Sequence, residues 1–202
     1  MASKPGERKT QILHTLAEML EQPHAARITT AALAARMQVS EAALYRHFAS
    51  KAQMFEGLIG FIETTVFTLI NQICTAHECG VTQTRYMITM LLGFAETNRG
   101  MTRVLTGDAL VTEDNRLQDR INHINDRLET SMRQSLRNAV VDGGLPADAD
   151  VSARASVLTH FVLGRWLRYA QSGWKLGPTT GLDAQLAWLL PLPPGPASTS
   201  MK

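Results

Sequence analysis

The sequence lacks most features of secreted and membrane proteins. It has two cysteines, Cys74 and Cys79, among 202 residues, and these are too few for a disulfide framework, so a reducing compartment is expected. The N-terminal residues have no apolar signal-peptide core. No uninterrupted apolar run approaches the roughly 20 residues that a membrane span needs. We therefore predict a cytoplasmic protein without a membrane span.

The residue combinations that enzymes need are also scarce. There is no Gly-rich phosphate loop and no HExxH pattern, and the isolated histidines have no nucleophile or acid at a catalytic spacing. His77, Glu78 and Cys79, with Cys74 upstream, are residue types that bind metals, but they lack the paired CxxC spacing of a zinc site. We predict no enzymatic activity, no metal and no cofactor.

The abundant residues favour helices. Aromatic residues make up 6% of the sequence, whereas Ala, Leu, Met and Arg, which lose little freedom in a helix, are plentiful. Apolar residues recur with a 3.6-residue period almost throughout, and strand-like alternation is not sustained. We predict an all-α protein of about nine helices. They cover approximately residues 8–21, 30–37, 41–48, 51–74, 82–98, 104–110, 112–141, 148–172 and 182–190. Gly80 is expected to break the chain after the fourth helix. Thr112 is expected to cap the seventh helix, followed by Glu113 and Asp114, which the helix dipole favours at this end. The apolar stripe of the seventh helix is Leu117, Ile121, Ile124, Leu128, Met132 and Leu136.

Charge is distributed unevenly along a chain whose formal net charge is +2. Residues 1–55 contain seven Lys or Arg and four acidic residues, whereas the other 147 residues contain thirteen and fourteen. The excess positive charge thus lies at the N-terminal end, where a phosphate-facing surface would need it. We assign residues 1–54 to an N-terminal domain, 55–190 to a helical dimerisation and regulatory domain, and the Pro-rich residues 191–202 to a disordered tail.

Residues 27–55 contain the most informative pattern. Thr30 can cap a two-turn helix, and Ser40 can cap the next one. In that second helix Leu44 and Phe48 are four residues apart and face inward. Small alanines let the two short helices cross at the steep angle of a helix-turn-helix.

The outward face of the second short helix carries residues that suit DNA. The next helix begins with a capping box at Ser50 and Gln53, which places Lys51 at an exposed first turn beside free backbone N–H groups, a typical anion site. The helix can thus enter a groove while its flanks hold phosphates. The candidate DNA-binding residues are Thr30, Ser40, Glu41, Ala42, Tyr45, Arg46, His47 and Lys51.

These residues resemble the signature of TetR-type DNA-binding domains. The matching positions are Ile28-Thr29-Thr30, Val39-Ser40, Leu44-Tyr45, His47-Phe48 and Lys51. Gln38 departs from the signature, because the turn commonly carries glycine in this family. If that position is left-handed, glutamine costs about 1 kcal/mol relative to glycine.

The resemblance extends to the nucleoid-occlusion factor branch of that family, through VSEAALYRHF, LLGFAETN, GMTRVLTGDAL, DRINHINDRLE and WKLGPTTGLDAQLAWLL. It implies a nucleoid-associated protein that binds chromosomal palindromes and inhibits assembly of the division protein FtsZ over DNA. Leu69 and Thr97 stand where better-known relatives tend to carry Arg, and this departure bears on the FtsZ contact. The groove between the fourth and fifth helices would face FtsZ, with Phe61, Met90, Gly93 and Asn98 at matching positions.

Plain core packing would explain Phe61 and Met90 equally well. The eighth and ninth helices are apolar on more than one face, so a second surface must cover them besides their own core. We predict a homodimer through these helices, with half-sites roughly 10 bp or a small multiple apart. The candidate interface residues are Phe161, Trp166, Leu167 and Trp188.

Two other functions stay open. A ligand-responsive TetR-type repressor would share the DNA-binding region, and several methionines could either line its ligand cavity or fill the core. The methionines in question are Met87, Met90, Met101 and Met132. A helical interaction module without DNA binding would keep its function when Arg46 and Lys51 are replaced by alanine.

Overall fold

The computed structural model describes residues 5–22, 28–111 and 113–190, and within these ranges all regular structure is helical. The predicted all-α class is therefore confirmed. In chain order the elements are α1 (Pro5–Leu20), α2 (Thr30–Arg36), α3 (Glu41–Tyr45), α4 (Lys51–Ala76), α5 (Gly80–Thr97), α6 (Arg99–Leu105), the 3-10 helix η1 (Asp108–Leu110), α7 (Asn115–Val141), α8 (Val151–Gln171) and α9 (Leu182–Leu189).

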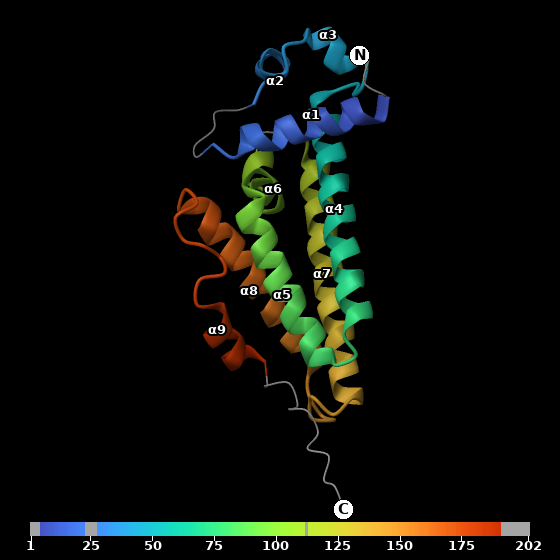
Figure 1. Ribbon diagram of the computed structural model, residues 1–202, viewed down its shortest axis with the longest axis vertical. Coiled ribbons are helices and arrows are strands. Elements are labelled where there is room, and N and C mark those ends of the chain that lie inside the picture. The colour runs from blue at the N-terminus through green and yellow to red at the C-terminus, as the bar shows by residue number, and fades with distance from the viewer. Residues whose placement is uncertain (1–4, 23–27, 112, 191–202) are drawn as a thin grey trace, which may run out of the picture.

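The long helices form an elongated bundle. Helices α4, α5 and α7 run along its long axis, and α8 packs against α5 and α7 (Figure 1). Helix α1 lies across one end of the bundle, in contact with α4 and α6, and α2 and α3 lie beyond it. Helix α9 lies outside α8, near the other end. The predicted boundary at residues 54/55 falls inside α4, and the predicted tail lies outside the described residues.

Helix α4 connects the two ends of the molecule. Ser50 caps it by accepting a hydrogen bond from the backbone N of Gln53 at 3.1 Å, and Gln53 Oε1 accepts one from the backbone N of Ala49 at 2.9 Å. The predicted capping box is thus present, except that the side chain of Gln53 bonds to the backbone N of Ala49 instead of that of Ser50. By length and composition α4 could cross a membrane, and eight of its 26 residues are buried in the bundle.

Gly80 was predicted to interrupt the chain, and this interpretation is wrong. Gly80 is the first residue of α5. A Cβ there would lie 2.2 Å from the backbone N of Ala139 and 2.2 Å from the carbonyl O of Ser135. Glycine is therefore needed because the first turn of α5 touches the backbone of α7, and not because the helix must end.

The start of α7 also differs from the prediction. Thr112, the expected cap, lies outside the described residues. Asp114 is the N-cap, and its carboxylate accepts a hydrogen bond from the backbone N of Arg116 at 3.0 Å. The predicted apolar stripe of this helix is buried throughout, at Leu117, Ile121, Ile124, Leu128, Met132 and Leu136.

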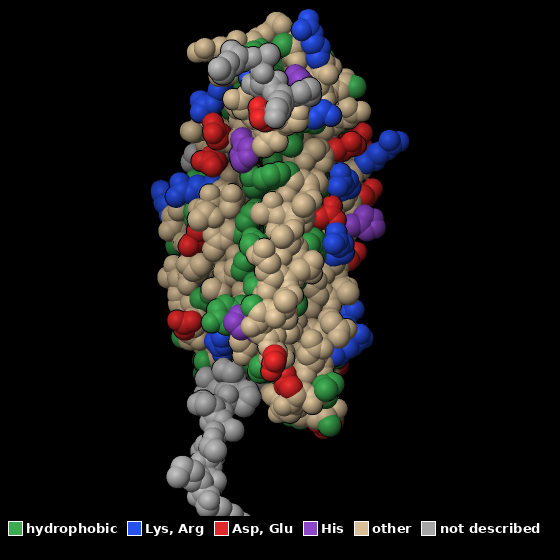
Figure 2. All heavy atoms as spheres, turned by 45° about the vertical axis from the view of Figure 1, so that its right-hand side comes forward, with side chains coloured by type: hydrophobic (Ala, Val, Ile, Leu, Met, Phe, Trp, Pro, Cys, Tyr) green, Lys and Arg blue, Asp and Glu red, His purple; other side chains and the backbone are tan. Residues whose placement is uncertain are grey.

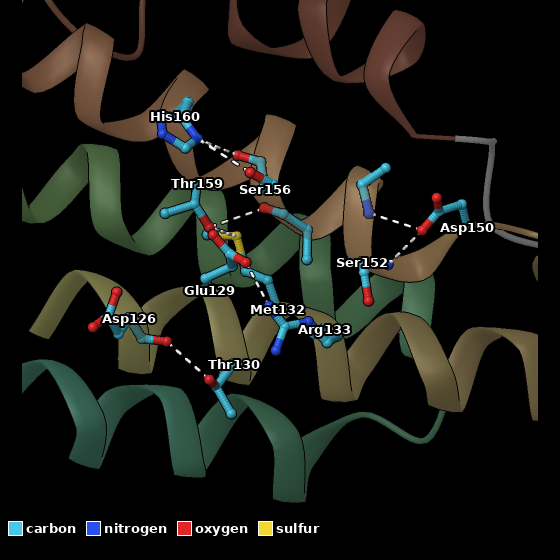
Figure 3. A network of polar contacts seen from close by, with 12 residues as sticks. Asp126, Glu129, Thr130, Met132, Arg133, Asp150, Ser152, Ser156, Thr159 and His160 are labelled. Atoms are coloured by element: carbon cyan, nitrogen blue, oxygen red, sulfur yellow. Dashed lines mark hydrogen bonds and ion pairs between the residues drawn. The ribbon is translucent and has the colours of Figure 1, made fainter. Parts of the chain in front are cut away.

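Trp166 on α8 was predicted to lie in a dimer interface, and the structure contradicts this. Its side chain is completely buried in its own chain, and its indole N–H donates to the carbonyl of Leu91 at 3.0 Å. The inner face of α8 also includes Thr159, which turns toward Met132 of α7, whereas His160 lies farther from α7 (Figure 3). Trp166 lies seven residues after Thr159 and so belongs to the same inner face.

Candidate nucleic-acid interface and partner surfaces

Two short helices form the predicted helix-turn-helix. The cap of α2 is Thr29, which accepts from the backbone N of Ala32 at 3.1 Å, and Thr30, the expected cap, is the first helical residue instead. Ser40 caps α3 as predicted, by accepting from the backbone N of Ala43 at 3.3 Å. Helix α3 ends at Tyr45, earlier than expected. Leu33, Ala34, Leu44 and Phe48, whose spacing predicts an inward position, are all buried. Met37 and Val39 are also predicted to face inward, but they are only half-buried and pack against the core.

The turn between α2 and α3 is strained at one residue. Gln38 has a φ of +55°, in the left-handed region. The turn is closed by hydrogen bonds from the backbone N of Gln38 to Ala35 O, at 3.1 Å, and from the backbone N of Val39 to Ala34 O, at 3.0 Å. Because this position is left-handed, glutamine costs free energy here relative to glycine.

Three predicted DNA-binding residues form one hydrogen-bonded cluster. The hydroxyl of Thr30 donates to Oε2 of Glu41 at 2.6 Å, and the hydroxyl of Tyr45 donates to Oγ1 of Thr30 at 3.4 Å. This cluster joins α2 to α3 and holds the carboxylate of Glu41 at the first turn of α3. Tyr45 remains 45% exposed, so its ring is available to a ligand.

Arg46 provides an unpaired cation on this surface. It follows the last residue of α3 and is exposed, and its guanidinium group makes no hydrogen bond or ion pair with another residue that the structure describes. Ala42 is also exposed, and His47 is half-buried. An exposed guanidinium without a partner can bind a phosphate or the edge of a guanine without breaking another contact.

The sequence predicts a free, exposed ammonium group at Lys51, but in the structure this group is paired. Lys51 is the first residue of α4, as expected, but its ammonium group forms an ion pair with Glu113, just before α7. The side chains are 20% and 8% exposed. Lys51 Nζ also lies 5.5 Å from the ring centre of Phe55. Sequence reasoning missed Glu113 because its acidic side chain was assigned to the dipole of α7.

The four predicted FtsZ-facing residues are all half-buried. Phe61 of α4 and Met90 of α5 pack against the core with part of each side chain accessible, so their burial is compatible with core packing and with a partner surface. The ring of His14 from α1 meets Phe61 edge-on, with ring centres 5.4 Å apart. Asn98 lies at the end of α5, where its amide donates to Phe94 O at 2.9 Å.

We define the α4–α5 surface as Phe61 and Leu69 of α4 with Met90 and Gly93 of α5. Figure 2 shows a run of hydrophobic side chains down the middle of this face, with charged side chains gathered along its right-hand edge. Glu63 of α4 pairs with two arginines of α7, and so its charge lies on the other side of α4. A Cβ on Gly93 would meet nothing within 4 Å.

The outer face of α8 and α9 exposes apolar side chains. Val157 and Leu167 are 56% and 42% exposed, Trp188 is 92% exposed, and Phe161 is half-buried. A Cβ on Gly164, between them on α8, would meet nothing within 4 Å. Exposed apolar side chains on α8 and an almost fully exposed tryptophan on α9 are typical of surfaces that a partner covers.

Arg165 fixes α9 and its preceding loop to α8. Its guanidinium donates to the carbonyls of Pro178 and Thr180 and to the side chain of Gln185. Burial lowers the pKa of Arg165, and the charge of Glu96 partly offsets this. Because all these bonds go to α9 and the loop before it, Trp188 is presented on a well-anchored helix.

Three of the methionines that could line a ligand cavity lie in the core. Met87, Met101 and Met132 are at most 6% exposed and belong to the core. We find four surface hollows of about 310–530 Å³, and none of the four is lined by a methionine. Among the described residues, no group of three or more His, Cys, Asp or Glu side chains could hold a metal ion.

Two family models match the chain. Residues 12–58 match the model described as bacterial regulatory proteins, tetR family, and residues 79–191 match the SlmA-like model described as tetracyclin repressor-like, C-terminal domain. The solved structure of the fatty acid degradation regulator FadR from Bacillus halodurans is similar with a TM-score of 0.78 and 13% identity, over 93% of this chain and 97% of that one. This likeness shows the fold.

Curated relatives are much closer in sequence. The nucleoid occlusion factor SlmA of Marinomonas sp. (strain MWYL1) is 48% identical over 178 residues, which are 88% of this chain and 90% of the relative. The protein of the same name from Vibrio cholerae is 46% identical over 188 residues, which are 93% and 96% of the two chains. The chain therefore belongs to the tetR family of bacterial regulatory proteins, in the group of the nucleoid occlusion factors SlmA.

Proposed function

We propose that this protein is a nucleoid occlusion factor, which binds palindromic chromosomal DNA as a homodimer and inhibits assembly of FtsZ over the nucleoid. The observation that carries the proposal is the outward face of α3, where an unpaired, exposed Arg46 stands beside the Thr30–Glu41–Tyr45 cluster. A recognition helix of this kind reads bases while neighbouring groups contact phosphates. The names of the relatives support the same function.

The DNA contact is tested by fluorescence anisotropy with a labelled palindromic duplex. Arg46→Ala removes a phosphate or base contact at both half-sites of the palindrome. We therefore expect this variant to bind the duplex at least tenfold more weakly than the wild type. Arg137→Ala is the matched control, because Arg137 is an exposed arginine of α7 that has no partner among the described residues. Equal affinities of the two variants would contradict the proposed role of Arg46. For the wild type, about eight neutralised phosphates predict a slope of log K against log salt of order −7.

Dimerisation is proposed through the outer face of α8 and α9, with Phe161, Leu167 and Trp188. A two-fold axis between these faces makes the contact self-complementary, and it places two recognition helices for a palindrome. The small Gly164 lets a partner helix approach closely, since nothing in its own chain occupies the space beside it.

FtsZ is proposed to bind the α4–α5 surface. Gly93 lies inside a helix, where glycine costs roughly 0.5–1 kcal/mol relative to alanine, and neither its conformation nor its own chain requires it. A partner that approaches the backbone closely would account for it. Because Leu69 and Thr97 provide no positive charge, we expect this contact to depend on apolar burial and to weaken little with added salt.

Co-sedimentation with FtsZ filaments, with and without the palindromic duplex, tests this surface. We expect DNA to increase the amount that sediments, because bound DNA orders the dimer. Gly93→Leu should abolish sedimentation while the fold stays intact. Thr130→Leu, which places the same leucine side chain on the exposed face of α7, is the control. Unchanged sedimentation of Gly93→Leu would overturn the assignment of the surface.

The competing function is a ligand-responsive repressor. The filled core around Met87, Met101 and Met132 does not favour it. Genome-wide binding distinguishes the two functions. An occlusion factor occupies many dispersed palindromes with little change in transcription, whereas a repressor occupies one or a few promoters. Increased expression of a neighbouring gene after deletion, with division unaffected, would refute the proposal.

A further inference from the structure

The ion pair between Lys51 and Glu113 joins the helix-turn-helix end of the molecule to the segment before α7. The two residues are 62 positions apart in the sequence. Glu113 is 8% exposed at its side chain and Lys51 is 20% exposed, so the ammonium group is turned away from solvent. The backbone N of Glu113 donates to Leu110 O at 2.9 Å, which ties the carboxylate to the end of η1.

This arrangement conflicts with a simple role in phosphate binding. The first turn of α4 is where a lysine beside free backbone N–H groups would hold a phosphate. A carboxylate and a phosphate present the same kind of anionic oxygen to an ammonium group. In this structure the carboxylate of Glu113 already occupies that role, because Lys51 is directed inward, over the ring of Phe55.

We propose that Glu113 is an internal competitor of DNA, and that Lys51 exchanges its carboxylate for a backbone phosphate when the protein binds a duplex. The inference rests on the proposed DNA binding and deepens it, by naming a residue that sets the affinity. Each protomer breaks one ion pair to make one phosphate contact, so the affinity is lower than the exposed cations alone would give.

The exchange also has a consequence away from the DNA. Glu113 directly precedes Asp114, the residue that caps α7. Release of Glu113 by DNA frees the segment between η1 and α7, and α7 as a whole packs against α4, α5 and α8. The bound and unbound states thus differ inside the larger part of the molecule.

The test compares the wild type with three variants by fluorescence anisotropy on a palindromic duplex, between about 50 and 200 mM salt. Glu113→Gln removes the competitor. Lys51→Gln removes the cation. Glu56→Gln is the matched control, because Glu56 is an exposed acid of α4 whose carboxylate makes no hydrogen bond or ion pair with another described residue. Circular dichroism and thermal unfolding verify that each variant is folded.

We expect Glu113→Gln to bind more tightly by about fivefold per protomer, which corresponds to an ion pair at the upper end of the usual range. Glu56→Gln should bind like the wild type to within about twofold. Lys51→Gln should reduce the magnitude of the salt slope by about 0.9 per protomer, because one phosphate is no longer neutralised.

Two results would overturn the inference while leaving DNA binding in place. One is a Glu113→Gln affinity equal to that of Glu56→Gln. The other is an unchanged salt slope for Lys51→Gln, which would mean that Lys51 stays on Glu113 in the complex. If neither the wild type nor any variant bound the duplex, the proposed function itself would fail. Binding of the duplex by Glu113→Gln alone would support both the proposed DNA binding and the competition by Glu113.

Discussion

Replacement of Gln38 by glycine should stabilise the protein. The left-handed conformation of Gln38, with φ at +55°, costs roughly 1–2 kcal/mol for a residue that has a Cβ. Its side chain is exposed and makes no hydrogen bond with another described residue, so its removal loses no contact. Glycine gives the unfolded chain more freedom, which offsets about 0.4–1 kcal/mol. The expected net gain is about 0.5–1 kcal/mol in the free energy of unfolding.

Thermal unfolding followed by circular dichroism measures this gain. In a chain of this size, 1 kcal/mol corresponds to a rise in Tm of about 2–4 °C, so we expect Gln38→Gly to raise Tm by about 1–4 °C. Gln38→Ala is the control, because alanine keeps the Cβ and therefore the strain, and its Tm should not rise. A Tm for Gln38→Gly at or below that of Gln38→Ala would refute the reasoning.

Three further substitutions test the packing. Trp174 also has a positive φ, +68°, but its indole N–H donates to Glu21 O at 2.7 Å. We therefore expect Trp174→Gly to lower the free energy of unfolding by about 2 kcal/mol or more. Chemical denaturation measures this change, and a gain in stability would contradict the expectation. Gly80→Ala should destabilise by several kcal/mol, since its Cβ would clash with α7 backbone, which the same assay measures. Trp188→Ala should shift the dimer to monomer in light scattering, while Val141→Ala, another strongly exposed residue, should not.

The local helical pattern could be predicted from the sequence, because it depends on residues three and four apart. The stripe of α7 from Leu117 to Leu136 and the inward residues of α2 and α3 repeat with the helical period. Ser40 was identified as a cap because capping residues act on backbone groups two or three residues away. Features of this kind require no knowledge of the tertiary arrangement.

Some of the misses are local, such as the cap of α2 at Thr29 instead of Thr30, but the larger ones involve distant residues. The periodicity of α8 did not identify the inner stripe, because both sides of the helix are apolar, and so Trp166 was assigned to the outside. Gly80 was interpreted as a helix breaker, since close contact with another helix leaves no mark in the local sequence. Lys51 and Glu113 were placed on exposed helix ends, and only the folded chain brings them together.

Because α4 is long, a small tilt of this helix displaces its end by a large distance. Its 26 residues form a rod of about 39 Å, with one end beside the recognition helix and the other near the opposite pole of the molecule. A tilt of about 5° about the far end would displace the first turn by about 3 Å, by the same helical dimensions. In the proposed symmetric dimer both α4 helices would tilt, and the distance between the two recognition helices would change by up to twice that displacement. A protein bound to one side of α4 would therefore change which spacing of DNA half-sites fits the dimer.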